Sequence, residues 1–269
     1  MALIDKLTAI ANAIRAKTGG TAKLSLDEMV TAISNIETGA PDNTALRGLI
    51  ERTVTNMTLP EDLTSIGAYA FRGCSNLALT SLPAGITRIG SSAFYGCTKL
   101  ALTSLPDGIT SIEDFLFREC SNLALTSLPA GITSIGSSAF YGCTKLALTS
   151  LPDGITSIGE NAFQGCSSLA LTSLPEGVTS IKTQAFYDCT NLALTSLPAG
   201  ITSIGYLAFG DCFYLSSLTF KGTPSSINST AFKLCSNLKT INVPWAEGAV
   251  SGAPWGATNA TINYNYTGE

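Results

Sequence analysis

Residues 128–150 read LPAGITSIGSSAFYGCTKLALTS, and this stretch decides the fold because the chain repeats it. The segment 83–100 recurs at 129–146 with a single change, Arg88 against Ser134. The cysteines of the chain all keep the same period of 23 residues: Cys74, Cys97, Cys120, Cys143, Cys166, Cys189, Cys212 and Cys235. Self-similarity at a fixed period of this size is the sequence signature of a solenoid.

Eight such units cover residues 59–242. In every unit a phenylalanine precedes the cysteine by three residues and a leucine follows it by three, so apolar residues hold fixed places. One unit alone cannot bury these side chains. Stacking the units turns each place into a buried column, which predicts a repeat solenoid with a continuous core.

Three segments of the unit carry local predictions. The Leu-Pro and Ile-Thr-Ser-Ile segments are short and bounded by turn residues, which is typical of strands. The glycine before the first isoleucine, as in Gly85, Gly108 and Gly131, is expected to adopt a positive φ in a turn. The Ala-Phe-x-Gly-Cys segment is expected to form a short helical or 3₁₀ turn that brings the chain back.

The pattern ITSIGxxAFxGCxxL resembles the BspA-like leucine-rich repeat, a family common in bacterial surface and adhesion proteins. The resemblance implies a leucine-rich-repeat-type right-handed coil of short parallel strands and short helical turns. The first six units depart from the family, because C-x-x-L-A-L-T-S replaces the usual C-x-x-L-x-x-I. Thr80 and Thr103 then take a place that usually points inward, so we expect a local bulge or a shifted strand start.

The cysteines allow two interpretations, a disulfide framework or a column of the core. Side chains of one column point the same way at the spacing of neighbouring strands, about 4.8 Å. A disulfide instead brings Cβ atoms to about 3.8 Å with converging directions. No C-x-x-C pair of the kind that binds zinc occurs in the sequence. We therefore predict free thiols that are buried as small apolar side chains.

Four parts follow from where the repeat starts and stops. Residues 1–39 are predicted to form a helical hairpin for attachment or oligomerisation, and 40–58 a linker and N-terminal cap that includes a short helix at 45–52. Residues 59–242 are the repeats, and 243–269 are a C-terminal cap in which Trp245 and Trp255 close the core. The stretch DKLTAIANAIRAKTG in the hairpin resembles an N-terminal module of bacteriophage tail and prophage proteins.

Composition excludes several function classes. The net charge is −4 and charged residues make up 13% of the chain, whereas nucleic-acid binders need a concentrated basic face. No apolar run is long enough for membrane insertion.

Histidine is absent, which removes the commonest general base and metal ligand, so we expect no enzyme, no metal and no cofactor. The first residues lack a signal-peptide pattern, so the protein is expected to be virion-associated or cytoplasmic before release, and to act at a bacterial surface.

Positions that vary between units are free of the demands of the core. The residue after each phenylalanine is such a position, and its tyrosines and arginines are types enriched at binding hot spots. The predicted binding residues are Arg72, Tyr95, Arg118, Tyr141, Gln164 and Tyr187. The alternative is a turn residue that varies freely, with each tyrosine partly packed on its neighbour.

Carboxylate pairs are the remaining catalytic candidates, since glycoside hydrolysis needs only two such groups. The pairs are Glu113/Asp114, Asp107/Asp153 and Asp188/Asp211. Units of equal length provide no projecting loop that could build a cleft around them, so hydrolysis is not expected.

The sequence thus predicts a non-catalytic recognition or adhesion protein. It would bind a cell-surface protein or glycan through the repeat surface, as a component associated with a phage or prophage tail. Residues 1–39 could also form a homo-oligomer. The alternative is a structural or scaffold protein of a bacterial cell without a specific ligand.

Overall fold

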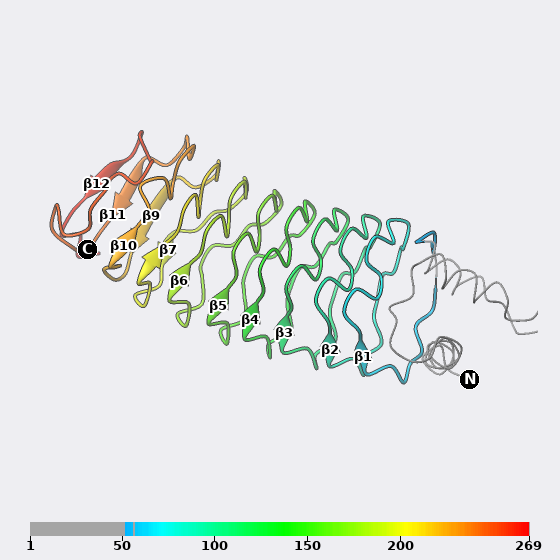
Figure 1. Cartoon of the computed structure of the whole chain (residues 1–269). Helices are drawn as coiled ribbons and strands as arrows, with labels where there is room; N and C mark the ends of the chain where they lie inside the picture. The colour runs from blue at the N-terminus through cyan, green and yellow to red at the C-terminus, as the bar shows by residue number, and fades with distance from the viewer. Residues whose placement is uncertain (1–51, 56, 269) are drawn as a thin grey trace, which may run out of the picture.

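The computed structural model describes residues 52–55 and 57–268, which form a leucine-rich-repeat solenoid of about nine coils (Figure 1). The coils follow one another along a single axis, with the C-terminus at the far end from β1. The predicted hairpin at 1–39 lies outside the described residues, as does nearly all of the helix predicted at 45–52. The described part contains no helix long and apolar enough to cross a membrane.

One strand per unit builds a parallel ladder along one side of the solenoid. These strands are β1 (Ser65–Ile66), β2 (Arg88–Ile89), β3 (Ser111–Ile112), β4 (Ser134–Ile135), β5 (Ser157–Ile158), β6 (Ser180–Ile181), β8 (Ser203–Ile204) and β10 (Ser226–Ile227). Equivalent residues of neighbouring units pair, as Ser134 does with Ser157. The isoleucine of each strand is buried and the residue before it is more exposed, so the strands predicted at the Ile-Thr-Ser-Ile segments are confirmed.

This ladder is interrupted between β2 and β3 and again between β5 and β6. In most units a glycine follows the strand, and a Cβ added at Gly136 would lie 2.6 Å from the backbone nitrogen of Asp114 in the preceding coil. Glu113 and Lys182 take this place after β3 and β6. The strands separate at these two places. Asn228 takes the same place after β10 and keeps its backbone hydrogen bond to the preceding coil at 2.9 Å.

A stack of phenylalanine rings fills the centre of the solenoid. From Phe71 to Phe232 the neighbouring ring centroids lie 5.2 to 5.7 Å apart, and the ring planes are within 15° of parallel. This is the offset stacking that aromatic rings prefer. The rings from Phe94 onward are fully buried. The repeated phenylalanine therefore forms the continuous core that the sequence predicts.

The Ala-Phe-x-Gly-Cys segment reverses the chain through tight turns. The backbone N–H of Cys143 donates to the carbonyl of Phe140 at 3.0 Å, and that of Tyr141 donates to Ser138 at 3.3 Å. Each of these bonds closes a single turn, and the N–H of Phe140 between them donates to Ala162 of the next coil at 2.8 Å, so the segment is a series of turns and not the predicted helical or 3₁₀ turn. Ser138 and Gly142 have φ values of 51° and 70°. These left-handed residues prevent the turn from continuing as a helix.

The prediction of a positive φ for the glycine before the first isoleucine is wrong. The left-handed glycine is instead the one before the cysteine, as in Gly73 and Gly96, with φ values of 75° and 73°. Gly85 is the third residue of a turn closed by the Ile86 N–H on the Pro83 carbonyl at 3.2 Å. A type I turn requires a negative φ at this place.

The Leu-Pro side of the coil changes along the molecule. Its strands pair in parallel only toward the C-terminal end: β7 (Ser196–Leu197), β9 (Ser217–Phe220), β11 (Thr240–Asn242) and β12 (Thr261–Asn263). In the first six units the strand predicted at Leu-Pro is absent. Leu102 is buried while Thr103 is exposed, and Ala147 donates a backbone hydrogen bond to Leu125 of the preceding coil at 3.2 Å. The A-L-T-S segment therefore loses the strand instead of forming a bulge within it.

All eight cysteines are free and buried, which confirms the predicted core column. Each thiol from the second unit onward donates a hydrogen bond to a phenylalanine carbonyl, as Cys143 Sγ does to Phe117 at 3.0 Å. Burial raises the pKa of Cys97 to about 12 and the pKa of Cys120 well above its ordinary value. The thiols from Cys97 to Cys212 thus link neighbouring coils as neutral donors, whereas a hydrogen bond with Cys212 lowers the pKa of Cys235.

We expect the thiols of the folded protein to resist Ellman's reagent at pH 8, and to react fully in denaturant. Folded-state pKa values above the unfolded value of about 8.5 also mean that stability is constant below that pH and falls as the pH rises toward 11. Ser150→Cys, at an exposed position, supplies a reactive control. Rapid labelling of the native thiols, or stability that rises with alkaline pH, would contradict the buried column.

Both ends of the core are closed by apolar side chains. Val54 and Leu59 are buried at the first coil. Trp255 follows Phe232 by one repeat length and is fully buried, 6.2 Å from the ring of Phe220 and 6.3 Å from the ring of Trp245. β12 pairs with β11 at a step of 21 residues, so the last coil is shorter than the others.

Candidate binding surface

Four of the six predicted binding residues form one stack on an edge of the solenoid. The guanidinium carbon of Arg72 lies 4.9 Å from the ring centroid of Tyr95. The guanidinium carbon of Arg118 lies 5.5 Å from Tyr95 and 4.3 Å from Tyr141. These are cation–π distances. We call Arg72, Tyr95, Arg118 and Tyr141 the Arg–Tyr ladder.

The repeat itself positions this ladder. The residue before each of these side chains is a buried phenylalanine that is locked in the ring stack, so the next residue is carried to the outer surface of the turn. Arg72 is exposed and the other three side chains are half-buried. Arg118 Nε also lies 3.4 Å from Glu119 Oε1 in a partly exposed ion pair. Tyr95 therefore has two guanidinium groups against its ring, one from each neighbouring coil.

The two remaining predicted residues do not belong to the ladder. Gln164 Oε1 accepts a hydrogen bond from the amide of Asn161 at 2.5 Å. The ring of Tyr187 lies over Gly210, where an added Cβ would come within 2.9 Å of it. The structure thus divides the column into a cation–π stack in the first four units and locally packed side chains beyond.

Sequence reasoning missed two aromatic residues beside the ladder. Arg72 lies 5.7 Å from the ring of Tyr69, and Arg118 lies 5.9 Å from the ring of Phe115. The exposed fractions of Tyr69 and Phe115 are 58% and 38%. The available signal was their spacing, since each precedes an arginine by three residues in a column that is otherwise without aromatic side chains.

The carboxylate pairs considered for catalysis include two residues, Glu113 and Asp114, that accept hydrogen bonds from nearby serines. Glu113 accepts a hydrogen bond from the Ser111 hydroxyl at 2.8 Å, and Asp114 accepts one from the Ser137 N–H at 2.6 Å. Desolvation, together with the nearby carboxylate of Asp211, raises the pKa of Asp188. Across residues 52–55 and 57–268, no three His, Cys, Asp or Glu side chains are grouped to hold a metal.

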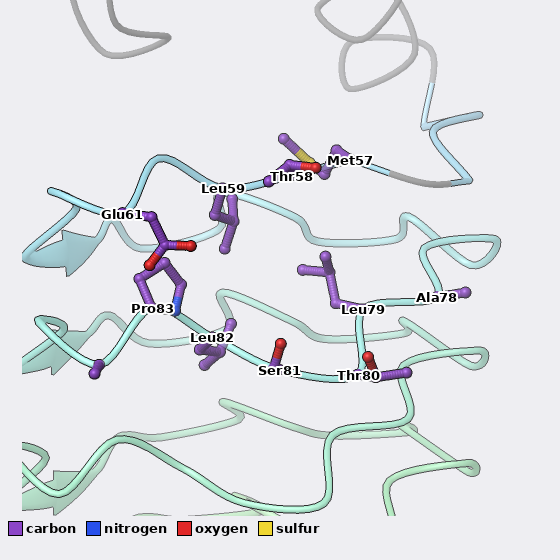
Figure 2. A pocket seen from close by; sticks show the side chains of 11 residues that line it. Met57, Thr58, Leu59, Glu61, Ala78, Leu79, Thr80, Ser81, Leu82 and Pro83 are labelled. Atoms are coloured by element: carbon purple, nitrogen blue, oxygen red, sulfur yellow. The ribbon is translucent and has the colours of Figure 1, made fainter.

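A cavity of about 400 Å³ opens between the first coils (Figure 2). Figure 2 shows Met57 and Leu59 on one side of it, and Leu79 and Leu82 from the next coil on the other. Glu61 is the one titratable side chain in its lining. The lining of this cavity therefore contains no pair of groups for acid–base catalysis. The Arg–Tyr ladder, in contrast, is suited to binding a partner by surface contact.

Comparison with known proteins gives a family. The BspA type leucine-rich repeat region, in six copies, matches residues 50–170 and 167–247. No curated protein matches the chain. Repeat proteins of this kind are typically non-catalytic.

Solved structures of bacterial leucine-rich-repeat proteins are similar to the chain. The leucine-rich repeat protein of T. pallidum is 33% identical, with a TM-score of 0.49 over 58% of this chain and 76% of that one. A leucine-rich repeat protein from Bacteroides ovatus is 23% identical, with a TM-score of 0.49 over 75% of this chain, which spans 64% of the B. ovatus protein. A leucine rich cell surface protein from Faecalibacterium prausnitzii is 27% identical, with a TM-score of 0.42 over 76% and 70%. On the extent of the family match, the chain belongs to the BspA-type leucine-rich-repeat family.

Proposed function

We propose that this protein is a non-catalytic recognition protein that binds a protein or glycan of a cell surface through the Arg–Tyr ladder. The observation that carries the proposal is the pair of guanidinium groups held on an exposed edge by tyrosine rings at 4.3 to 5.5 Å. Arginine and tyrosine dominate binding hot spots because they combine large contact area with directed polar groups.

The stack favours binding for a physical reason. A free arginine side chain loses rotamer entropy when a ligand fixes it, whereas a guanidinium already held against a ring has lost part of that freedom before binding. The units have equal lengths, so no inserted loop covers this edge. The ladder is thus both pre-organised and accessible.

The wider setting is a further part of the same proposal. Residues 1–39 would attach the solenoid to a larger assembly, or to a second copy of the chain, and the resemblance of that segment to tail and prophage modules favours a phage tail. In that setting the repeat surface would meet the bacterial surface after release.

Binding of the purified chain to a panel of bacterial cells tests the ladder. We expect Tyr95→Ala/Tyr141→Ala to weaken binding at least tenfold, since each truncated hot-spot aromatic costs about 1–2 kcal/mol. The matched control is Tyr206→Ala/Tyr266→Ala, which removes two exposed tyrosines from the C-terminal coils. Circular dichroism verifies that each variant is folded.

Equal binding by the ladder and control variants would remove the ladder from the proposal. Absence of binding to any cell surface by the unmodified chain would favour the scaffold function instead.

A further inference from the structure

The charge of the protein is unevenly distributed along the edge that carries the ladder. We define the basic edge as the segment from the residue after phenylalanine to the second residue after cysteine, in the first four units. It contains four basic side chains and one acidic one, Glu119, although the whole chain has a net charge of −4. The basic residues are Arg72, Lys99, Arg118 and Lys145. The same segment in the last four units contains Lys233 against Asp188 and Asp211.

The cations of the basic edge are available to a ligand. Arg72, Lys99 and Lys145 are exposed. Lys145 Nζ donates to the neutral side-chain oxygen of Asn122 at 2.6 Å, which positions the ammonium without neutralising it. Among residues 52–55 and 57–268, Glu119 is the one carboxylate paired with them, through Arg118. Cations held this close together without matching carboxylates raise the local positive potential, which favours an anionic partner.

The spacing of the cations indicates an extended partner. The arginines occupy the first and third units and the lysines the second and fourth, so each type recurs every second coil, at about 10 Å for coils about 4.8 Å apart. The cavities between the first coils and along the strands β3 to β10 are not lined by the basic edge, so a ligand at this edge would lie flat along the solenoid axis. A linear polymer with acidic groups at regular intervals fits this arrangement.

The aromatic residues decide between kinds of polymer. Tyr69 and Phe115 expose 58% and 38% of their surface beside the two arginines. The apolar face of a sugar ring packs on an aromatic ring, whereas a polyphosphate or a run of acidic side chains offers no such face. Taking the proposed recognition function as given, we infer that the basic edge binds a linear polysaccharide that carries carboxylate groups. Its carboxylates pair with the exposed cations Arg72, Lys99 and Lys145, Arg118 adds to the local positive potential, and the sugar rings lie on Tyr69 and Phe115.

Polygalacturonate oligomers serve as the probe, with neutral dextran and polyglutamate as comparison polymers, and binding is measured by calorimetry on the full chain. We expect polygalacturonate to bind, dextran not to bind, and the affinity to fall as salt concentration rises. Arg72→Gln/Arg118→Gln should weaken binding at least tenfold. Lys233→Gln/Lys239→Gln removes the same charge from the C-terminal coils and should change it less than twofold.

A second pair of substitutions tests the sugar contact. Tyr69→Ala/Phe115→Ala should weaken the binding of polygalacturonate and leave any weak binding of polyglutamate unchanged. The inference is overturned if polygalacturonate does not bind, if dextran binds equally well, if polyglutamate binds as tightly, or if both charge variants lose affinity equally. Ladder-dependent binding to cells in the absence of polygalacturonate binding would overturn this inference alone and leave the proposed function standing.

Discussion

Replacement of Phe140 by alanine is expected to lower the free energy of unfolding by about 3–5 kcal/mol. The ring is fully buried and stacks on Phe117 at 5.7 Å and on Phe163 at 5.4 Å. Backbone hydrogen bonds hold the coils on both sides, so the neighbouring rings cannot close the cavity. Chemical denaturation followed by circular dichroism measures the loss.

Phe71→Ala is the matched control. This ring lies at the end of the stack with one ring neighbour, Phe94 at 5.2 Å, and is 6% exposed. We expect a smaller loss than for Phe140. Equal losses at the two positions would mean that the stack contributes nothing beyond the burial of separate rings.

Trp255→Ala is expected to have a comparable effect by a different route. Trp255 is fully buried at the end of the phenylalanine column, and its indole N–H donates to the Ser251 carbonyl at 2.8 Å. Its removal exposes Phe220 and the last buried layer, and an uncapped repeat array tends to associate end to end. We expect a loss of about 3–5 kcal/mol in thermal or chemical unfolding and a concentration-dependent rise in light scattering.

Trp245→Phe is the control that shows whether any substitution of a tryptophan in the C-terminal cap causes the same loss of stability and the same association as Trp255→Ala. The indole nitrogen of Trp245 is buried and has no hydrogen-bond partner among the described residues. Phenylalanine keeps most of the apolar contact with Phe220 while removing that unsatisfied donor, so the variant should be about as stable as the parent. If Trp245→Phe associates as strongly as Trp255→Ala, the cap does not depend on the Trp255 ring.

The core could be predicted from the sequence because its apolar residues recur at a fixed period of 23 residues. The cysteine and phenylalanine places recur without exception, and a place that recurs in every coil becomes a column whatever the local backbone does. The free thiols follow from this geometry alone, since side chains that point the same way at the strand spacing do not converge on a disulfide.

The errors concern the backbone between the columns. Every unit has more than one glycine or turn residue, and nothing in the pattern shows which of them is left-handed, so Gly85 was an incorrect choice and Gly73 was overlooked. The strand at Leu-Pro depends on cross-coil hydrogen bonds that the A-L-T-S segment does not complete. Tyr69 and Phe115 were missed because the sequence was compared one repeat position at a time, whereas each of these aromatic residues contacts an arginine that occupies a different repeat position.

The two places where the strand ladder is interrupted divide the molecule into three blocks: β1 and β2, β3 to β5, and the coils from β6 onward. In a quasi-one-dimensional array, the weakest interface sets how far unfolding spreads. The strand pairing is therefore weakest at Glu113 and Lys182, whereas the phenylalanine stack continues across both places. The contact between Tyr95 and Arg118 spans the first interruption, between β2 and β3. A polymer bound along the basic edge would therefore contact the coils on both sides of this interruption and oppose their separation.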